Sequence, residues 1–143
     1  MTSLDKVYQA YLAKVLDDEY GYWTEEEIKT DMRDVLNGAL PWFKFPRVDI
    51  TIDGDNFVGD LSNEEIQIIA TFMMCEWVSR TITNWENLKP LYEEKDFSHA
   101  NLLDKLKAIL ETMQDKAAAL ERIYYRSIKR EPFDFTQLAS SIE

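Results

Sequence analysis

A run of acidic residues between positions 49 and 60 comes nearest to the spacing of a chemical site. Six residues match positions one, three, five, six, seven and twelve of a calcium-binding EF-hand loop: Asp49, Thr51, Asp53, Gly54, Asp55 and Asp60. The last position requires a bidentate Glu, however, and the alternating apolar residues of 48–52 predict a strand where an EF-hand has a helix. The sequence therefore favours an acidic hairpin turn, and whether that turn binds any cation stays an open question.

The residues needed for most catalytic chemistry are missing. The chain has one His and one Cys, so it lacks the parts of a zinc cluster or of a paired nucleophile and base. We interpret Cys75 as a small core residue and His99 as a residue of a first helical turn. The carboxylates stand in runs, which are usually solvated faces, and only four glycines are present. We expect no enzyme activity, no metal site and no cofactor.

Length and charge narrow the function further. The 143 residues are 45% hydrophobic, which suits one folded domain. The formal net charge of −11 argues against electrostatic binding of nucleic acid or of an anionic membrane. Acidity is concentrated near the start, because residues 1–60 hold 13 acidic and 6 basic side chains, against 14 and 10 in residues 61–143.

Neither a signal peptide nor a membrane span is expected. Charged and polar residues interrupt 1–16, which is typical of an amphipathic helix. The most apolar stretch, 66–78, is shorter than the roughly 20 residues that a spanning helix needs. A single thiol also suits a reducing compartment.

The first half of the chain predicts two helices and a hairpin. Ser3 caps a helix that should run to about Asp18, and Thr24 with Glu27 forms a capping box for a second helix that Gly38 should end. The aromatic segment 41–46 has proline at both ends, so we expect a loop that fills the core. A hairpin is expected within 48–58, turning at Asp53-Gly54.

The second half predicts one buried helix and one long helix. Ser62 and Glu65 form a second capping box, and residues 66–78 are apolar around nearly the whole circumference, so this helix should be central. Met73, Met74 and Trp77 should fill the core. The segment 83–96 is expected to be a short helical turn followed by a loop.

A last helix should run from Ser98 to Arg130, where Pro132 ends it, with a length on the order of 50 Å. Its expected core seam is broken by Lys116 and consists of Leu102, Leu106, Ile109, Met113, Leu120 and Ile123. The fold class is therefore mainly α: a single helical domain over 1–131 with a small β-hairpin, followed by an extended tail over 132–143. That tail should dock on a neighbouring chain or fold back on its own domain.

The order of these elements resembles the small head-to-tail connector, or neck, proteins of tailed bacteriophages. The likeness covers most of residues 24–130. It rests on the Pro-bounded segment 41–46, the acidic hairpin, the capped helix 61–77, the segment 96–101 that opens the long helix, and Tyr124-Tyr125-Arg126 near its end.

The resemblance implies a structural protein of the virion, made in the host cytoplasm. It should form a ring, expected to be dodecameric, between the portal and the tail, with the portal and other neck or tail proteins as partners. DNA would pass through the ring without specific binding. The expected subunit contacts are Leu120, Ile123, Tyr124, Phe133, Phe135 and Leu138.

An acidic lumen would repel DNA and let it slide, so we expect Glu25 and Glu26 of the second helix, or Asp53 and Asp55 of the hairpin, to face the channel. The alternative is a small acidic adaptor in the cytosol that binds a basic or helical partner through its last helix.

Overall fold

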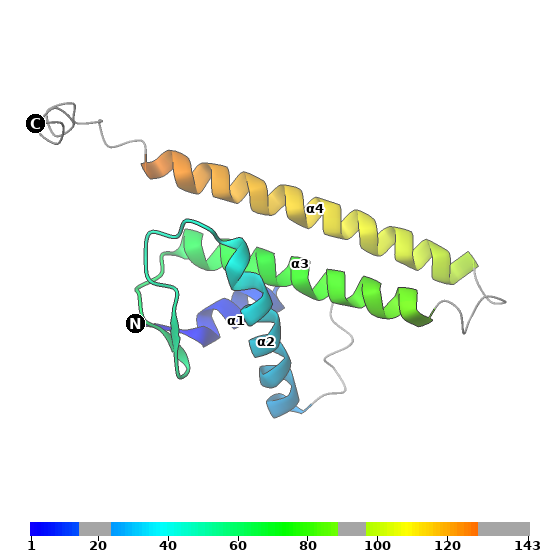
Figure 1. Cartoon of the computed structure of the whole chain (residues 1–143), viewed down its shortest axis with the longest axis horizontal. Coiled ribbons are helices and arrows are strands. Elements are labelled where there is room, and N and C mark those ends of the chain that lie inside the picture. Colours follow the sequence, from blue (N-terminus) through cyan, green and yellow to red (C-terminus); the bar gives the residue numbers. More distant parts are fainter. Residues whose placement is uncertain (15–23, 89–96, 129–143) are drawn as a thin grey trace, which may run out of the picture.

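The computed structural model describes residues 1–14, 24–88 and 97–128 and confirms a mainly helical fold. The helices are α1 (Leu4–Leu12), α2 (Glu25–Ala39), α3 (Asn63–Leu88) and α4 (Phe97–Ile128), with a 3₁₀ turn η2 at Leu40–Trp42 (Figure 1). Three two-residue strands form a small antiparallel sheet: β1 (Thr2–Ser3), β2 (Ile52–Asp53) and β3 (Asn56–Phe57).

Helix α3 is the central layer of the molecule, as its apolar circumference predicts. Helices α1 and α2 pack on one side of it and α4 lies along the other (Figure 1). Met73, Met74 and Trp77 are buried, which confirms their assignment to the core. Buried side chains of α1, α2, α3 and α4 belong to one cluster. The expected domain boundary at residue 131 and the tail 132–143 lie outside the described residues.

Helices α3 and α4 form a long antiparallel pair. Tyr124 of α4 contacts Glu65 near the start of α3, and Lys107 forms an ion pair with Glu86 near the end of α3. The described core seam of α4 repeats at alternating three- and four-residue spacing and consists of Leu103, Leu106, Leu110, Met113, Ala117, Leu120 and Tyr124.

The predicted seam is confirmed at Leu106, Ile109, Met113 and Leu120, which lie in or against the core, and is wrong at its later positions. Lys116 and Ile123 are exposed, and Ala117 and Tyr124 occupy the core positions instead. The two lines of residues share Leu106, Met113 and Leu120, so spacing alone did not distinguish them. The correction removes the apparent fault at Lys116 and leaves a continuous seam against α3.

The helix starts follow their caps, whereas several helix ends differ from expectation. Glu65 N donates to Ser62 Oγ and Ser62 N to Glu65 Oε1, which completes that capping box. Gly38 lies inside α2 and has no positive φ, so it is not the predicted left-handed cap. Helix α1 already ends at Leu12, and Asp18 lies outside the described residues.

Helix α3 continues to Leu88, so residues 83–88 are helical where a short turn and a loop were predicted. The last turns of α3 project beyond α1 and α2, beside the start of α4 (Figure 1). Packing against α4, which includes the ion pair between Glu86 and Lys107, stabilises the helical conformation of residues 83–88 beyond the apolar run of residues 66–78.

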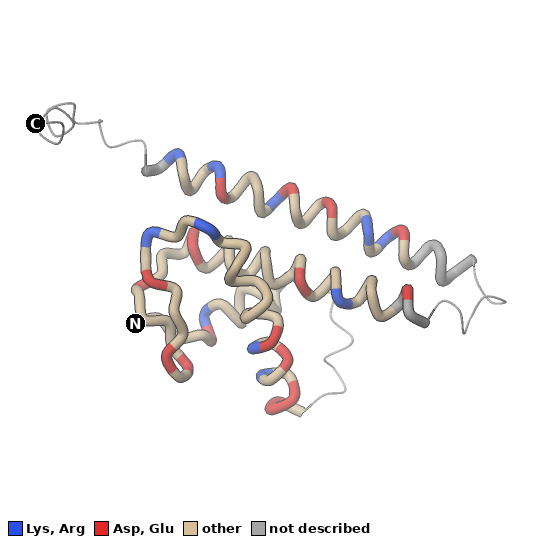
Figure 2. Tube along the Cα trace, in the orientation of Figure 1, with Lys and Arg blue, Asp and Glu red and all other residues tan. Residues whose placement is uncertain are grey.

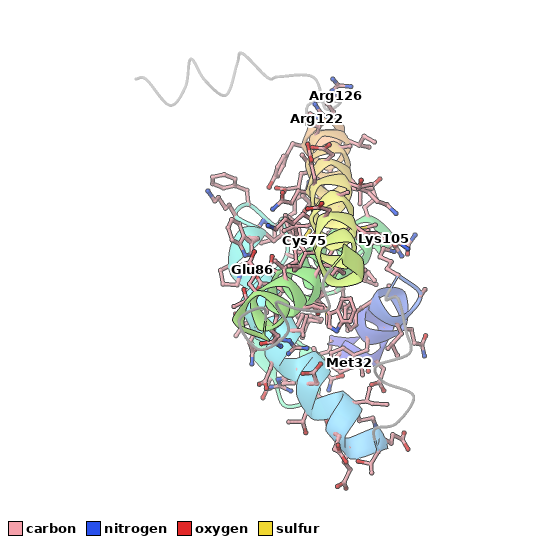
Figure 3. All side chains as sticks on the ribbon, turned by 90° about the vertical axis from the view of Figure 1, so that its right-hand side faces the viewer. Met32, Cys75, Glu86, Lys105, Arg122 and Arg126 are labelled. Carbon is pink, nitrogen blue, oxygen red and sulfur yellow. The ribbon has the colours of Figure 1, made fainter. Side chains whose placement is uncertain are left out.

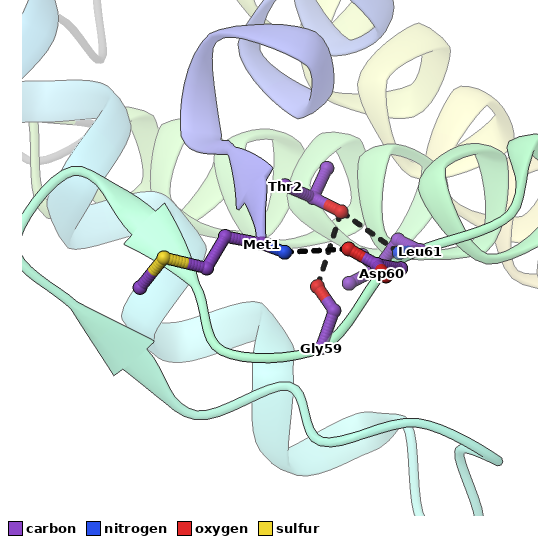
Figure 4. A network of polar contacts seen from close by, with 5 residues as sticks. All are labelled: Met1, Thr2, Gly59, Asp60 and Leu61. Atoms are coloured by element: carbon purple, nitrogen blue, oxygen red, sulfur yellow. Dashed lines mark hydrogen bonds and ion pairs between the residues drawn. The ribbon is translucent and has the colours of Figure 1, made fainter.

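The hairpin is confirmed and gains a third strand from the N-terminus. Gly54, with φ of 63°, occupies the first position of a two-residue turn, as a type II′ turn requires. Strand β1 pairs with β3, and Thr2 Oγ1 donates to Gly59 O and accepts from Leu61 N (Figure 4). The Met1 ammonium also pairs with Asp60. These contacts tie the chain start to the entry of α3.

Gly59 allows this junction to close, because a Cβ there would lie 2.6 Å from the Asp49 carbonyl oxygen. Gly59→Ala should destabilise the fold by about 2–3 kcal/mol, since backbone rather than a side-chain tip must move. Urea unfolding followed by circular dichroism measures this. Val58→Ala, at an exposed neighbour, is the control and should cost under about 0.5 kcal/mol. Equal decreases in the free energy of unfolding for the two variants would contradict the close packing at Gly59.

Candidate interaction site

The expected interface residues of α4 differ in what they offer to a neighbour. Ile123 is 56% exposed and available for contact, whereas Leu120 is half-buried in the seam. Tyr124 is only 2% exposed and so offers a neighbouring chain almost no surface. Phe133, Phe135 and Leu138 lie outside the described residues.

Tyr124 is the centre of a polar junction inside its own chain. Its hydroxyl donates to Glu65 Oε2 over 2.8 Å and accepts from the Arg47 backbone nitrogen over 2.8 Å. The Arg47 guanidinium carbon lies 4.5 Å from the centre of the Tyr124 ring and the guanidinium donates to the Tyr124 carbonyl oxygen. Phe43 meets the same ring edge-on at 5.5 Å. The junction thus joins the start of α3, the loop before the hairpin and the end of α4.

This junction is structural in character. Burial raises the pKa of Tyr124 to about 12, and the adjacent Glu65 carboxylate adds to the rise. The hydroxyl therefore stays protonated near neutral pH and holds Glu65, which is 3% exposed, by a hydrogen bond. Because the carboxylate also accepts from Ser62 N, both of its oxygens have partners.

The aromatic segment 41–46 fills the core only in part. Phe43 is buried as predicted, but Trp42 and Phe45 are 57% and 72% exposed, which corrects that expectation for two of the three rings. Trp42 instead forms one wall of a groove between α3 and α4. The apolar lining of this groove consists of Trp42, Phe72, Cys75, Ala117 and Ala118, and its volume is about 180 Å³.

Two carboxylates stand at the groove, and each accepts a hydrogen bond from an aromatic side chain. Trp42 Nε1 donates to Glu76 Oε1 over 2.9 Å, and the Tyr125 hydroxyl donates to Glu121 Oε2 over 3.1 Å. Within the described ranges neither carboxylate has an ion-pair partner. Ser79 and Gln114 complete the polar lining. The groove therefore combines an apolar floor with uncompensated negative charge.

Cys75 is half-buried in this groove and is not a reactive thiol. Burial, with a smaller contribution from Glu76, raises its pKa from 9.0 to about 11. At neutral pH the thiolate is scarce, which fits the interpretation of Cys75 as a structural residue.

The acidic residues expected to face a channel lie on α2 and on the hairpin. Glu25, Glu26, Asp53 and Asp55 are all exposed. Arg33 of α2 donates to the Gly54 carbonyl oxygen over 3.0 Å and so joins α2 to the hairpin turn. Figure 2 shows acidic residues gathered on α2 and on the hairpin, on the side of the body away from α4. The opposite edge carries Arg122 and Arg126, which lie near the end of α4 (Figure 3).

Within the described parts of the chain, no group of three or more His, Cys, Asp or Glu side chains is placed to hold a metal ion. A hydrogen bond with the Thr51 side chain and a second from the Thr51 backbone nitrogen, over 2.9 Å, lower the pKa of the Asp49 carboxyl. No described helix has both the length and the apolar character that a membrane crossing requires. Searches against protein families, curated proteins and solved structures found no match.

Sequence reasoning missed both the Tyr124 junction and the groove. A buried partner for Glu65 was not foreseen, because Glu65 already had a role in a capping box. The run Ala117-Ala118-Ala119 was the available signal for the groove, since small side chains in a helix seam leave space beside their neighbours.

Tyr124→Phe should destabilise the protein by about 1–3 kcal/mol, because it removes one buried partner from Glu65 and another from the Arg47 backbone. Tyr125→Phe is the control: its hydroxyl is part-buried and bonds with Glu121 of the same helix and with the Phe45 backbone, but it has no buried carboxylate as partner, so its loss should cost less, about 0.5–1 kcal/mol. Chemical unfolding of both variants measures the difference. If Tyr124→Phe lowers the free energy of unfolding by no more than the control does, the junction does not hold the helices together.

Proposed function

We propose that this protein is a structural component of the head-to-tail connector of a tailed bacteriophage, forming a ring at the portal through which DNA passes. The proposal rests on the order of elements noted in the sequence and, above all, on the exposed carboxylates that α2 and the hairpin carry. It assigns no catalytic role to any residue, and it places the protein in the virion at the joint between head and tail.

The exposed carboxylates of α2 and of the hairpin support the proposal. Carboxylates of α2 and of the hairpin form one exposed surface, joined through Arg33. A channel lined by such a surface repels phosphate and gives DNA no counterion-release gain on binding. The other edge, with Arg122, Arg126 and the exposed aromatic rings of Trp42 and Phe45, is the surface for protein contacts.

The adaptor alternative has less support from the described contacts. A partner helix would need an apolar stripe on α4, but the seam of α4 faces α3 along the length of the pair. Ile123 is the exposed large apolar residue on the described part of α4, which is little for a helix-in-groove interaction.

Portal rings test the proposal directly. The full chain, mixed with purified portal rings and separated on a density gradient, should move with the portal at saturating stoichiometry of one copy per portal subunit. An unrelated acidic protein of similar size is the control for non-specific association. Failure of the chain to move with the portal at both low and moderate salt would contradict the proposal and favour the adaptor.

Charge reversal tests the predicted channel surface separately. Replacing Glu25, Glu26, Asp53 and Asp55 by Lys should slow DNA passage through reconstituted portal complexes by roughly tenfold or more at low salt, and added salt should restore it. The control reverses four exposed carboxylates elsewhere: Glu64, Asp104, Glu111 and Asp115. It changes the net charge equally and should leave passage unaltered. Equal slowing by the two variants would contradict a lumen lined by α2 and the hairpin.

A further inference from the structure

The groove between Trp42, α3 and α4 has the size and character of a site for one aromatic ring. Its volume is about 180 Å³, and an apolar cavity of about 150 Å³ is large enough to bind benzene. Phe72, Ala117 and Ala118 supply an apolar floor, and the indole of Trp42 stands at its side. A phenyl side chain is therefore a ligand of matching size.

The charge of the groove further defines this ligand. Glu76 and Glu121 both line the groove, and within the described residues neither is paired with a cation. A ligand that carries basic groups a few residues from its phenyl ring would meet both carboxylates. The matching chemistry is a short peptide with a Lys or Arg pair close to a Phe.

The sequence after α4 contains such a peptide. Lys129 and Arg130 precede Phe133 by only a few residues, and an extended chain spans about 10 Å between Arg130 and Phe133. We propose that Phe133 of one copy occupies the groove of a second copy, with Lys129 and Arg130 beside Glu76 and Glu121. This inference rests on the proposed ring. This assigns both a donor segment and an acceptor site to each subunit.

Reach favours a second copy over the chain's own groove. Ala117 and Ala118 lie about 15 Å from Ile128 along the axis of α4, at 1.5 Å per residue. The five residues from Ile128 to Phe133 span at most about 17 Å when fully extended. A chain's own Phe133 would therefore reach the groove only if residues 129–133 were almost fully extended and turned back along α4, whereas a second copy requires neither. Donor and acceptor on different faces make a heterologous contact, which closes into a ring when the rotation fits.

Disulfide trapping tests the contact, because Cys75 lines the groove and is the chain's one natural thiol. The full chain carrying Phe133→Cys, oxidised with copper phenanthroline at about pH 9 to offset the raised pKa of Cys75, with and without portal rings, should give covalent dimers and longer ladders on a non-reducing gel. Ser140→Cys is the position control, and its yield of covalent dimers should be at least fivefold lower. The double variant with Phe133→Cys and Cys75→Ser should give no cross-link through the groove.

Three results would overturn the inference. Cross-linking of Phe133→Cys no stronger than that of Ser140→Cys would show that the segment does not reach the groove. An internal disulfide, seen as a monomer without free thiol, would assign the groove to the chain's own tail. Covalent dimers that form equally well with Cys75→Ser, which leaves one thiol per chain, would place the contact elsewhere.

A second measurement avoids dependence on the introduced thiol. Phe133→Ala should weaken self-association in sedimentation velocity by at least tenfold, whereas Leu138→Ala should weaken it less. Equal effects would contradict a specific role for Phe133. Portal binding by the unaltered chain distinguishes the two proposals: binding without cross-links contradicts the groove contact alone, and cross-links without binding contradict the connector function alone.

Discussion

The structure depends on one constraint: residues 66–78 of α3 are apolar around nearly the whole circumference and must be covered on almost every side. Helices α1 and α2 cover one side and the seam of α4 covers the other, so residues 68 to 74 of α3 are almost entirely buried. The hydrophobic free energy of this burial fixes where α4 lies, because no other element of the described chain is long enough to match α3. The antiparallel pair and the acidic surface on its far side both follow from that placement.

Polar contacts at the ends of α3 then determine the register of this packing. Glu65 is a capping residue for α3 and also the acceptor for Tyr124 near the end of α4, so one side chain links the start of a helix to its partner. Arg47 brings the loop before the hairpin to the same point. Small residues in the α4 seam, Ala117 and Ala118, leave the groove beside Trp42 unfilled. Stability and a candidate contact site thus arise from the same helix pair.

Features encoded locally could be predicted from the sequence, and features that depend on distant residues could not. The caps at Ser3, Thr24 and Ser62, the buried circumference of α3 and the turn at Gly54 each follow from a few neighbouring residues. Strand β1 is too short to carry a signal of its own. The sequence placed Ile123 rather than Tyr124 in the α4 seam because Ile is the more apolar residue. Tyr124 is buried by partners from α3 and from the loop, which spacing does not reveal. The channel and ring roles remain proposals.

The most direct measurement is an electron cryomicroscopy map of the full chain reconstituted with portal rings. The account predicts a closed ring on the portal with the carboxylates of α2 and of the hairpin lining its lumen, and with each groove at a subunit boundary. A map in which single copies bind without contacting one another, or in which Lys and Arg line the lumen, would contradict it.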